Sequence, residues 1–330
     1  MRDEGRGTRD ERRGTRDEGR GVRVVFMGTP VFAVPILEGL LTQGYHVVGV
    51  VTQPDKPAGR GQQVAVSPVK RLALERELPV LQPKGFRRPE AVEHLRALAP
   101  EVIVLAAYGH LLPPAVLAIP PLGCLNVHAS LLPRHRGAAP ISAAILAGDA
   151  VTGVTIMRLD AGMDTGDVLA QAQLPILPDD TTASLSERLA RLGATLLLAT
   201  LPRWAAGQIV PQPQEHAQAT YTHPVRKEDG QINWQRPAVA IERQVRAYFP
   251  WPSAHTTWQG RRLQIWRATA RNDEAPGNPG DVVLWHNDLA VVTGEGVLIL
   301  HELQIEGRRP LPAADFARGQ RGFVGTRLGK

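Results

Sequence analysis

The sequence has few of the features that mark secreted, thiolate-metal or membrane proteins. Cys124 is the only cysteine in 330 residues, which excludes a disulfide framework and a zinc site built from several thiolates. No apolar run reaches the roughly 18 residues of a membrane-spanning helix, and the N-terminal region lacks the apolar stretch of a secretory signal. We therefore expect a cytoplasmic protein with no membrane partner, in which Cys124 is a small buried hydrophobe.

Two common nucleotide-binding motifs are also missing. The first apolar run, Val22–Met27, is followed by Gly28-Thr29-Pro30, where a dinucleotide fingerprint would begin. The motif G-x-G-x-x-G is incomplete, because Pro30 and Phe32 occupy positions that need glycine. No phosphate-binding G-x-x-x-x-G-K-[ST] loop occurs either. These absences favour a plain strand-to-helix turn over NAD binding.

What remains is the composition of a globular protein with a basic balance. Hydrophobic residues make up 43% of the chain, the net charge is +6 and the isoelectric point is near 9.9. The length predicts about two domains. The stretch from Pro211 to the end holds 15 basic and 12 acidic residues, so about half of the excess lies there. A basic balance is a moderate indication of a polyanionic partner.

The first 21 residues form a region of their own. From Arg2 they repeat a seven-residue unit, RDEGRGT, RDERRGT and RDEGRGV, with no apolar position in the repeat before Val22. A heptad period without apolar a and d positions cannot build a coiled coil. We predict a disordered tail over residues 1–21 and assign it no function.

Apolar strands and helical patterns alternate from Val22 onward. The predicted strands are 22–27, 46–52, 102–107, 124–128 and 153–157, and the predicted helices are 31–41, 68–78, 89–98, 139–147 and 184–204. Such alternation predicts an α/β domain with a mostly parallel sheet. Sheets of this kind bind ligands beyond the carboxyl ends of their strands.

The composition changes after Gly207. Pro211, Pro213 and a polar run predict a linker, and a helix over 238–248 is followed by β segments at 262–268, 281–284, 290–293 and 296–303. This pattern predicts a smaller β domain, a barrel. The expected organisation is a catalytic domain over 22–209, a linker over 210–227 and a C-terminal domain over 228–330.

A first candidate site lies in the segment GCLNVHASLLPRHRGAAP, residues 123–140. Strand alternation puts Asn126 and His128 on the same face, so an amide and an imidazole meet at the carboxyl end of a strand. The alternative is a satisfied core histidine beside a turn asparagine.

A second candidate is MRLDAGMDTGD, residues 157–167, which contains Asp160, Asp164 and Asp167. It does not match a calcium-binding loop. A carboxylate here could orient an imidazole and stabilise its protonated form. The alternative is an ordinary solvated acidic loop.

A third candidate is the connection QPDKPAGRGQQVAVSP, residues 53–68. It is longer than the usual connection in an α/β unit and carries Asp55, Lys56 and Arg60 on a backbone rich in Gly and Pro. A loop with exposed cations suits contact with phosphates. A passive surface loop is the alternative.

Taken in order, these segments resemble the 10-formyltetrahydrofolate-dependent formyltransferases, and among them the methionyl-tRNA formyltransferases. The resemblance covers Val22 to the C-terminus and is carried by MGTPVFAVP, VVTQPDKPAGRGQQ, SPVK, AAYGHLLP, GCLNVHASLLPRHRGAAP, TGVTIMRLDAGMDTGD and YFPWP. The pattern N-x-H-x-SLLP with the downstream D-x-G-D is specific to formyltransferases that use 10-formyltetrahydrofolate as the formyl donor. The PAGRG loop and the appended β domain point to the tRNA acceptor.

The resemblance implies a Rossmann-like domain with an OB-like C-terminal domain, and roles for particular residues. The implied catalytic residues are Asn126, His128 and Asp164; the implied folate-binding turn is Ser130, Leu131, Leu132 and Pro133; the implied tRNA-binding residues are Lys56 and Arg60. The chain departs from the family pattern at Gln62 and Gln63, where lysines are frequent. This difference weakens the electrostatic attraction that we expect between the loop and tRNA. No metal is implied.

The implied activity is transfer of the formyl group of 10-formyltetrahydrofolate to methionyl initiator tRNA, for translation initiation, by a monomer. Two rivals stay open at this point. A formyltransferase acting on a small amine would explain the catalytic segments but not the PAGRG loop or the second domain. A non-catalytic RNA-binding protein would not need Asn126, His128 and Asp164 together.

Overall fold

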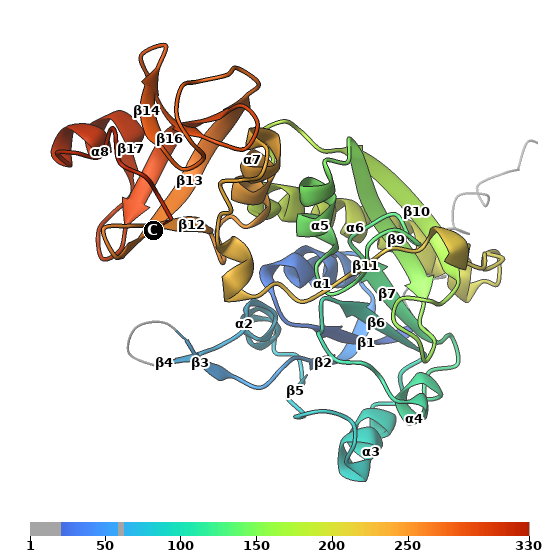
Figure 1. Ribbon diagram of the computed structural model, residues 1–330. Coiled ribbons are helices and arrows are strands. Elements are labelled where there is room, and N and C mark those ends of the chain that lie inside the picture. Colours follow the sequence, from blue (N-terminus) through green and yellow to red (C-terminus); the bar gives the residue numbers. More distant parts are fainter. Residues whose placement is uncertain (1–20, 59–62, 330) are drawn as a thin grey trace, which may run out of the picture. The chain divides into compact units, whose positions relative to one another are not determined.

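The computed structural model describes residues 21–58 and 63–329, and it divides into two compact units (Figure 1). The first unit contains the chain up to Arg136, residues 153–173 and residues 187–220. The second contains residues 137–152, 174–186 and everything from Tyr221 onward. Each unit consists of several separate segments of the chain, whereas the sequence analysis expects each domain to be one continuous range. The predicted tail over 1–21 lies almost wholly outside the described residues.

The first unit is built on a seven-stranded sheet. Its strands are β1 (Arg23–Gly28), β2 (His46–Val51), β5 (Val80–Leu81), β6 (Val102–Ala106), β7 (Cys124–His128), β9 (Val151–Arg158) and β10 (Val168–Pro175), in the spatial order β10-β9-β7-β6-β1-β2-β5. Strands β1, β2, β5, β6 and β7 are parallel, and β9 is antiparallel to β7. This confirms the mostly parallel sheet predicted from the alternation of strands and helices.

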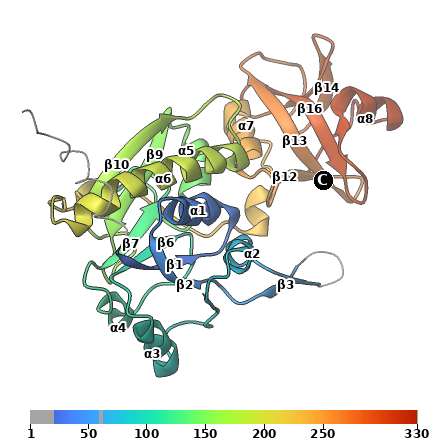
Figure 2. The same ribbon diagram turned by 180° about the vertical axis from the view of Figure 1, so that it is seen from behind.

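Helices cover both faces of this sheet, which is why its strands read as continuous apolar runs. The helices of this region are α1 (Val34–Thr42), α2 (Pro68–Glu75), α3 (Pro89–Ala97), α4 (Pro114–Leu117) and α6 (Thr182–Ala205), with the 3-10 turn Val31–Ala33 before α1. Residues of α3 and α4 share a buried cluster with Val25 and Ile103. Figure 2 shows α1 and α6 on the other face, where Gly193 of α6 lies directly against Val127 of β7.

Local signals fix where the helices begin. The Oγ of Ser67 accepts a hydrogen bond of 3.2 Å from the backbone N–H of Lys70, so Ser67 caps α2 and satisfies a donor that the helix leaves open. Pro68 and Pro89 occupy the first helical positions of α2 and α3, where proline loses no hydrogen bond. The predicted helix starts are confirmed for both helices.

The second unit contains an antiparallel sheet. Its strands are β12 (Ala254–Trp258), β13 (Arg261–Arg271), β14 (Val282–Trp285), β15 (Asp288–Val292), β16 (Val297–Ile305) and β17 (Leu311–Pro312), in the order β12-β13-β16-β15-β14 with β17 on β16. His286 and Asn287 join β14 to β15 with φ values of 47° and 71°. This pair of positive φ values is typical of the tight hairpin turn that matches the twist of a sheet. The predicted smaller β domain is confirmed.

Helices α7 (Ala238–Ala247) and α8 (Ala313–Gly319) close the core of that sheet. Trp258 packs edge to face on Phe316 and Phe323, with ring centroids 5.9 Å and 5.1 Å away, an arrangement that aromatic rings favour. Helix α5 (Pro140–Ala147) packs against α7 within the same unit. The short elements that remain are β3 (Lys56–Ala58), β4 (Gln63–Ala65), β8 (Arg136–Gly137), β11 (Tyr221–Thr222) and the 3-10 turns His216–Gln218 and Lys227–Gly230.

Two expectations about the whole chain can be compared with this structure. Cys124 is 1% exposed, and burial raises the pKa of its thiol to about 12, so it is the buried hydrophobe that we expected. Within residues 21–58 and 63–329, no helix has the length and apolar character to span a membrane.

Candidate active site

The first candidate pair stands at the carboxyl end of β7, in the middle of the sheet. Asn126 pairs with Leu105 of the parallel strand β6, and His128 pairs with Thr155 of the antiparallel strand β9. Because the two residues are separated by one position, their side chains emerge on the same face, as the sequence predicted. Asn126 is half-buried, and His128 is 6% exposed.

The imidazole of His128 has a defined partner on each side. Its Nε2 lies 3.0 Å from the backbone oxygen of His135. A carbonyl oxygen only accepts hydrogen bonds, so Nε2 carries the hydrogen in this arrangement. Its Nδ1 lies 3.7 Å from Oδ1 of Asp164. Nδ1 is therefore the nitrogen without hydrogen in the neutral ring, and it faces the Asp164 carboxylate.

The three carboxylates of the acidic loop, residues 157–167, have different partners. Asp160 folds the loop, because its Oδ1 accepts hydrogen bonds from the backbone N–H of Gly162 at 3.0 Å and from the hydroxyl of Thr165 at 2.7 Å. Asp167 lies 3.8 Å from the Arg158 guanidinium. Asp164 has a φ of 52° and directs its carboxylate to His128. The structure thus brings Asp164, and not the other two, to the imidazole.

Side chains of β9 and β10 form hydrogen bonds with the backbone of the turn that follows β7. The hydroxyl of Thr155 donates to the backbone oxygen of Ser130 at 2.7 Å and accepts from the backbone N–H of Leu132 at 3.1 Å. Gln171 donates its amide hydrogens to the oxygen of Leu132 and to the same hydroxyl, at 2.8 Å and 3.0 Å. These contacts fix the backbone of the turn that contains Ser130, Leu131, Leu132 and Pro133. Ser130 is fully buried, and its Oγ donates to the oxygen of Arg134 at 2.6 Å.

Thr155 and Gln171 are residues that the sequence analysis did not select. Thr155 belongs to a strand that was recognised, and Gln171 to a strand that was not. Their only sequence signal is a polar residue within a strand, and each of the two strands holds a second residue of the same type, so this signal is too common to single out a site.

The long connection after β2 is described only in part. Lys56 lies in β3, which pairs with β4, and Arg60 lies outside the described residues. The base of the connection is anchored by Asp55, which forms an ion pair with Lys70 and accepts a hydrogen bond of 2.9 Å from the amide of Gln82. These two partners lower the pKa of the Asp55 carboxyl. Asp55 is therefore an anchor of the connection, while the side chains of Lys56 and Arg60, the two cations expected to bind tRNA, lie outside the described part of the chain.

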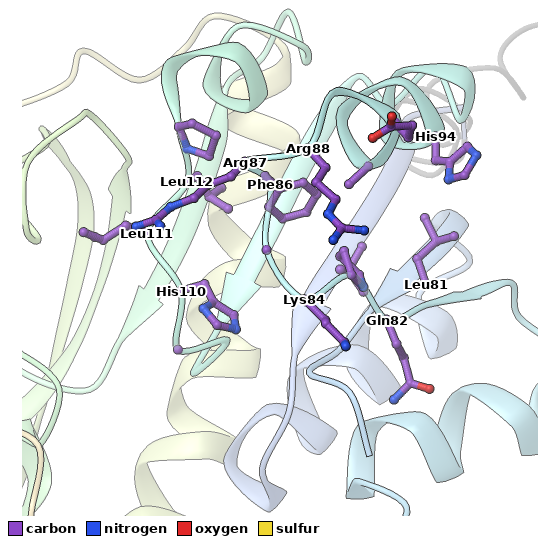
Figure 3. Close-up of a pocket in the computed structure, with 17 residues that line it drawn as sticks. Leu81, Gln82, Lys84, Phe86, Arg87, Arg88, His94, His110, Leu111 and Leu112 are labelled. Carbon is purple, nitrogen blue, oxygen red and sulfur yellow. The ribbon is translucent and has the colours of Figure 1, made fainter. Parts of the chain in front are cut away.

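A cavity of about 1120 Å³ opens at the same edge of the sheet (Figure 3). Val51 at the end of β2 and Leu81 at the end of β5 lie in its wall, and residues 109–113 after β6 close another side. All these strands are parallel to β7, so the cavity opens at the sheet edge that carries His128. This is the edge where such sheets bind ligands.

The lining of this cavity combines cations with an apolar and aromatic wall. Lys84, Arg87 and Arg88 contribute positive charge, and Phe86 and the His110 ring contribute planar groups. Tyr108 backs this wall, with its ring 6.4 Å from Phe86 and 5.4 Å from His110, centroid to centroid. A site of this composition suits a ligand with a flat conjugated ring and an anionic end. The sequence analysis quoted the segment AAYGHLLP but gave its residues no role.

The described part of the chain was also compared with the side-chain groupings that bind metal ions. Over residues 21–58 and 63–329, no three His, Cys, Asp or Glu side chains are grouped as they would be around a metal ion.

Comparison with known proteins assigns the family. The model of the formyl transferase family matches residues 22–201, and the model of its C-terminal domain matches residues 224–321. The methionyl-tRNA formyltransferase of Chloroflexus aggregans is 52% identical over 90% of this chain and 97% of its own length. That of Roseiflexus castenholzii is 53% identical over 93% and 99%. The chain belongs to the methionyl-tRNA formyltransferase family.

Solved structures with the same fold are more distant in sequence. An N-formyltransferase from Helicobacter canadensis, in complex with folinic acid and dTDP-3-aminofucose, gives a TM-score of 0.63 at 19% identity, over 84% of this chain and 98% of its own. HypX from Aquifex aeolicus, in complex with tetrahydrofolic acid, gives 0.60 at 19% identity, over 92% and 48%. These likenesses concern the fold. The family resemblance drawn from the sequence motifs is confirmed by the close relatives.

Proposed function

We propose that this chain transfers the formyl group of 10-formyltetrahydrofolate to the α-amino group of methionyl initiator tRNA, for translation initiation in the cytoplasm. The observation that carries the proposal is the meeting of His128 and Asp164 at 3.7 Å, beside Asn126 and at a ligand-binding sheet edge, in a chain about half identical to methionyl-tRNA formyltransferases.

The proposed chemistry forms one C–N bond and breaks another. The methionyl amine attacks the formyl carbon, and the carbonyl oxygen becomes an oxyanion on a tetrahedral carbon. The bond to N10 of the folate then breaks, and the proton that leaves the amine ends on N10. Asn126 donates its amide hydrogens to the oxyanion; in other enzymes, loss of one such donor lowers the rate about 100- to 1000-fold.

His128 is proposed to move the proton, through Nδ1. With Nε2–H fixed on the His135 oxygen at 3.0 Å, the ring does not need to rotate during the reaction. Asp164 stabilises the imidazolium that forms when Nδ1 accepts the proton of the attacking amine. The protonated ring then returns that proton to the leaving nitrogen.

The donor is proposed to bind along the edge of the sheet, next to these groups. Ser130, Leu131, Leu132 and Pro133 contact the folate through the turn that Thr155 fixes. We add the cavity beside β2, β5 and β6 to that site. Its planar wall suits the conjugated rings of the donor, and Lys84, Arg87 and Arg88 suit the carboxylates of its glutamate end.

The tRNA is proposed to bind through Lys56 and Arg60 and through the C-terminal domain. The domain bounds that we propose remain 22–209 for catalysis, 210–227 for the linker and 228–330 for the OB-like domain, in a monomeric enzyme.

Contacts between tRNA phosphates and basic side chains release counterions, so the affinity for tRNA falls as the salt concentration rises. We expect the KM for tRNA to rise several-fold between 50 and 200 mM salt, and the KM for the donor to change less; equal changes in both would contradict phosphate-based binding.

A comparison of acceptors tests the proposal. The chain is assayed with 10-formyltetrahydrofolate and either methionyl initiator tRNA or glycinamide ribonucleotide. We expect formylation of the charged tRNA alone. Transfer to the ribonucleotide instead would support an enzyme for small amines, and transfer to neither, with tRNA still bound, would support a non-catalytic RNA-binding protein.

A further inference from the structure

A segment that the sequence predicts to be a linker reaches into the catalytic site. Gln214 is 7% exposed, and its amide nitrogen donates to two backbone oxygens of the acidic loop, that of Asp164 at 2.9 Å and that of Gly166 at 2.7 Å. The first carbonyl belongs to Asp164 itself and the second lies two residues further on, so both belong to the loop from which the carboxylate of Asp164 projects to His128. One amide group therefore holds the backbone that aims this carboxylate.

The orientation of Gln214 is itself fixed by a buried cation. Arg136 is fully buried, and its Nε and Nη2 donate to Oε1 of Gln214 at 3.1 Å and 2.7 Å. An arginine offers only donors, so the amide oxygen must face Arg136, and the amide nitrogen must face the two carbonyls. Arg136 also contacts Nδ1 of His216 through Nη2, at 3.2 Å.

The same segment fixes the other partner of the imidazole. The backbone N–H of His135 donates to the hydroxyl of Thr220 at 2.8 Å, and the N–H of Arg136 donates to the backbone oxygen of Thr220 at 2.8 Å. His135 has a φ of 56°, a strained value for a residue other than glycine. Thr220 thus holds in place the residue whose carbonyl accepts the Nε2–H of His128.

We propose that Arg136 and Gln214 are positioning residues of formyl transfer, which act on the reaction through Asp164. The buried guanidinium sets the amide of Gln214, the amide holds the backbone around Asp164, and the carboxylate is thereby aimed at Nδ1 of His128. This inference rests on the proposed function, because its readout is the transfer of the formyl group.

The inference predicts that substitutions at Gln214 and Asp164 are not additive. Gln214→Glu keeps an oxygen for Arg136 and removes the donor to the two carbonyls. We expect kcat to fall about 10- to 100-fold, with the KM values for tRNA and donor within about twofold of the unchanged enzyme. In a chain that already carries Asp164→Asn, the same substitution should lower kcat by less than about threefold, because residues that act as one unit couple in a double-mutant cycle.

The matched control is Gln212→Glu, which makes the same change in charge two residues away on an exposed side chain and should leave kcat and both KM values unchanged. Thermal unfolding of every variant is measured alongside. If Gln214→Glu does not fold, the uncharged Gln214→Met replaces it in the same cycle.

Three results overturn the inference: losses at Gln214 and Asp164 that multiply fully, a rise in KM without a fall in kcat, or a kcat at Gln214 within twofold of the unchanged enzyme. An unchanged chain that does not formylate methionyl-tRNA overturns the proposed function instead, so the two failures are distinguishable.

Discussion

At the scale of single residues, backbone groups position the candidate catalytic side chains. The carbonyl of His135 selects which nitrogen of His128 carries hydrogen, and the N–H groups that fold the acidic loop leave the Asp164 carboxylate near the other nitrogen. Asn126 and His128 were placed on one face by strand alternation alone. The role of Asp164 came only from the family pattern, because nothing in an acidic loop indicates which of its carboxylates points inward.

The first prediction concerns the reacting groups. Asn126→Ala and His128→Ala should each lower kcat about 100- to 1000-fold, since each removes a group that stabilises the charged transition state. Steady-state formyl transfer to methionyl-tRNA measures this. His46→Ala is the matched control, because His46 is exposed at the amino end of β2, at the edge of the sheet opposite the site. Turnover within tenfold of normal in both variants would refute the catalytic assignment.

The second prediction concerns Thr155. Thr155→Val keeps the shape of the side chain but removes the hydroxyl that serves Ser130, Leu132 and Gln171. Leaving the buried backbone oxygen of Ser130 and N–H of Leu132 without this partner costs about 1–3 kcal/mol. We expect the KM for the donor to rise at least fivefold and the KM for tRNA to change less. Thr195→Val on the exposed side of α6 should change neither; a selective rise in the KM for tRNA would contradict the assignment of the turn.

At the scale of elements, strands β10 and β12 were not predicted because neither has a clear run or alternation of apolar residues. Strand β10, with the sequence VLAQAQLP, is rich in Ala and Gln, which are not favoured in sheets. Strand β12, with the sequence AHTTW, is short and partly polar. Both are stabilised by neighbouring strands rather than by an apolar pattern of their own. Strands β1, β2, β6 and β7 of the parallel part were predicted because burial on both faces demands continuous apolar runs, whereas the two-residue parallel strand β5 was not predicted.

The third prediction concerns the contact of β9 with β10. A Cβ at Gly153 would lie 2.1 Å from the backbone oxygen of Ala172 and 2.6 Å from the side chain of Leu131. Gly153→Ala should therefore separate the two strands and displace the turn at Leu131, with a loss of about 1–3 kcal/mol in the free energy of unfolding and a higher KM for the donor. Urea unfolding and kinetics measure both. Gly319→Ala, with open space around its position, is the control; an unchanged KM and stability at Gly153 would contradict this view of the contact.

At the scale of the whole molecule, the two-part architecture was predicted from composition, and each compact unit takes segments from more than one stretch of the chain. Segments 137–152 and 174–186 lie with the C-terminal unit, although they interrupt the strands and helices of the first. No local signal in the sequence marks such an exchange, because the contacts that define it join residues far apart in the chain. Composition and periodicity describe each element, and only tertiary contacts say which elements share a core.

The fourth prediction concerns acid stability of the second unit. Arg327 donates to both carboxylate oxygens of Asp281, at 2.6 Å and 3.1 Å, and lowers the pKa of Asp281 to about 2. A carboxyl whose pKa is lower in the folded state stabilises the fold above its unfolded pKa near 3.9, and this contribution is lost as pH falls toward 2. Because the pair is partly exposed, we expect Asp281→Asn to cost about 1 kcal/mol at pH 7.

Urea unfolding at pH 7 and pH 2.5 tests this prediction, and the difference between the unchanged chain and Asp281→Asn should shrink markedly at the lower pH. Asp315→Asn is the control, because its ion pair with Arg318 is more exposed and should contribute less at either pH. A difference that grows on acidification would contradict the sign derived from the pKa.

The partner of His128 Nε2 is a carbonyl of the main chain, and this has an evolutionary consequence. Main-chain oxygens are present whichever amino acid is encoded, so drift at codon 135 cannot delete the partner, provided that the newcomer accepts a left-handed conformation. Glycine or asparagine there would preserve the imidazole's tautomer while changing the visible sequence. A substitution that abolishes this contact would have to displace the main chain at residue 135 rather than exchange a side chain.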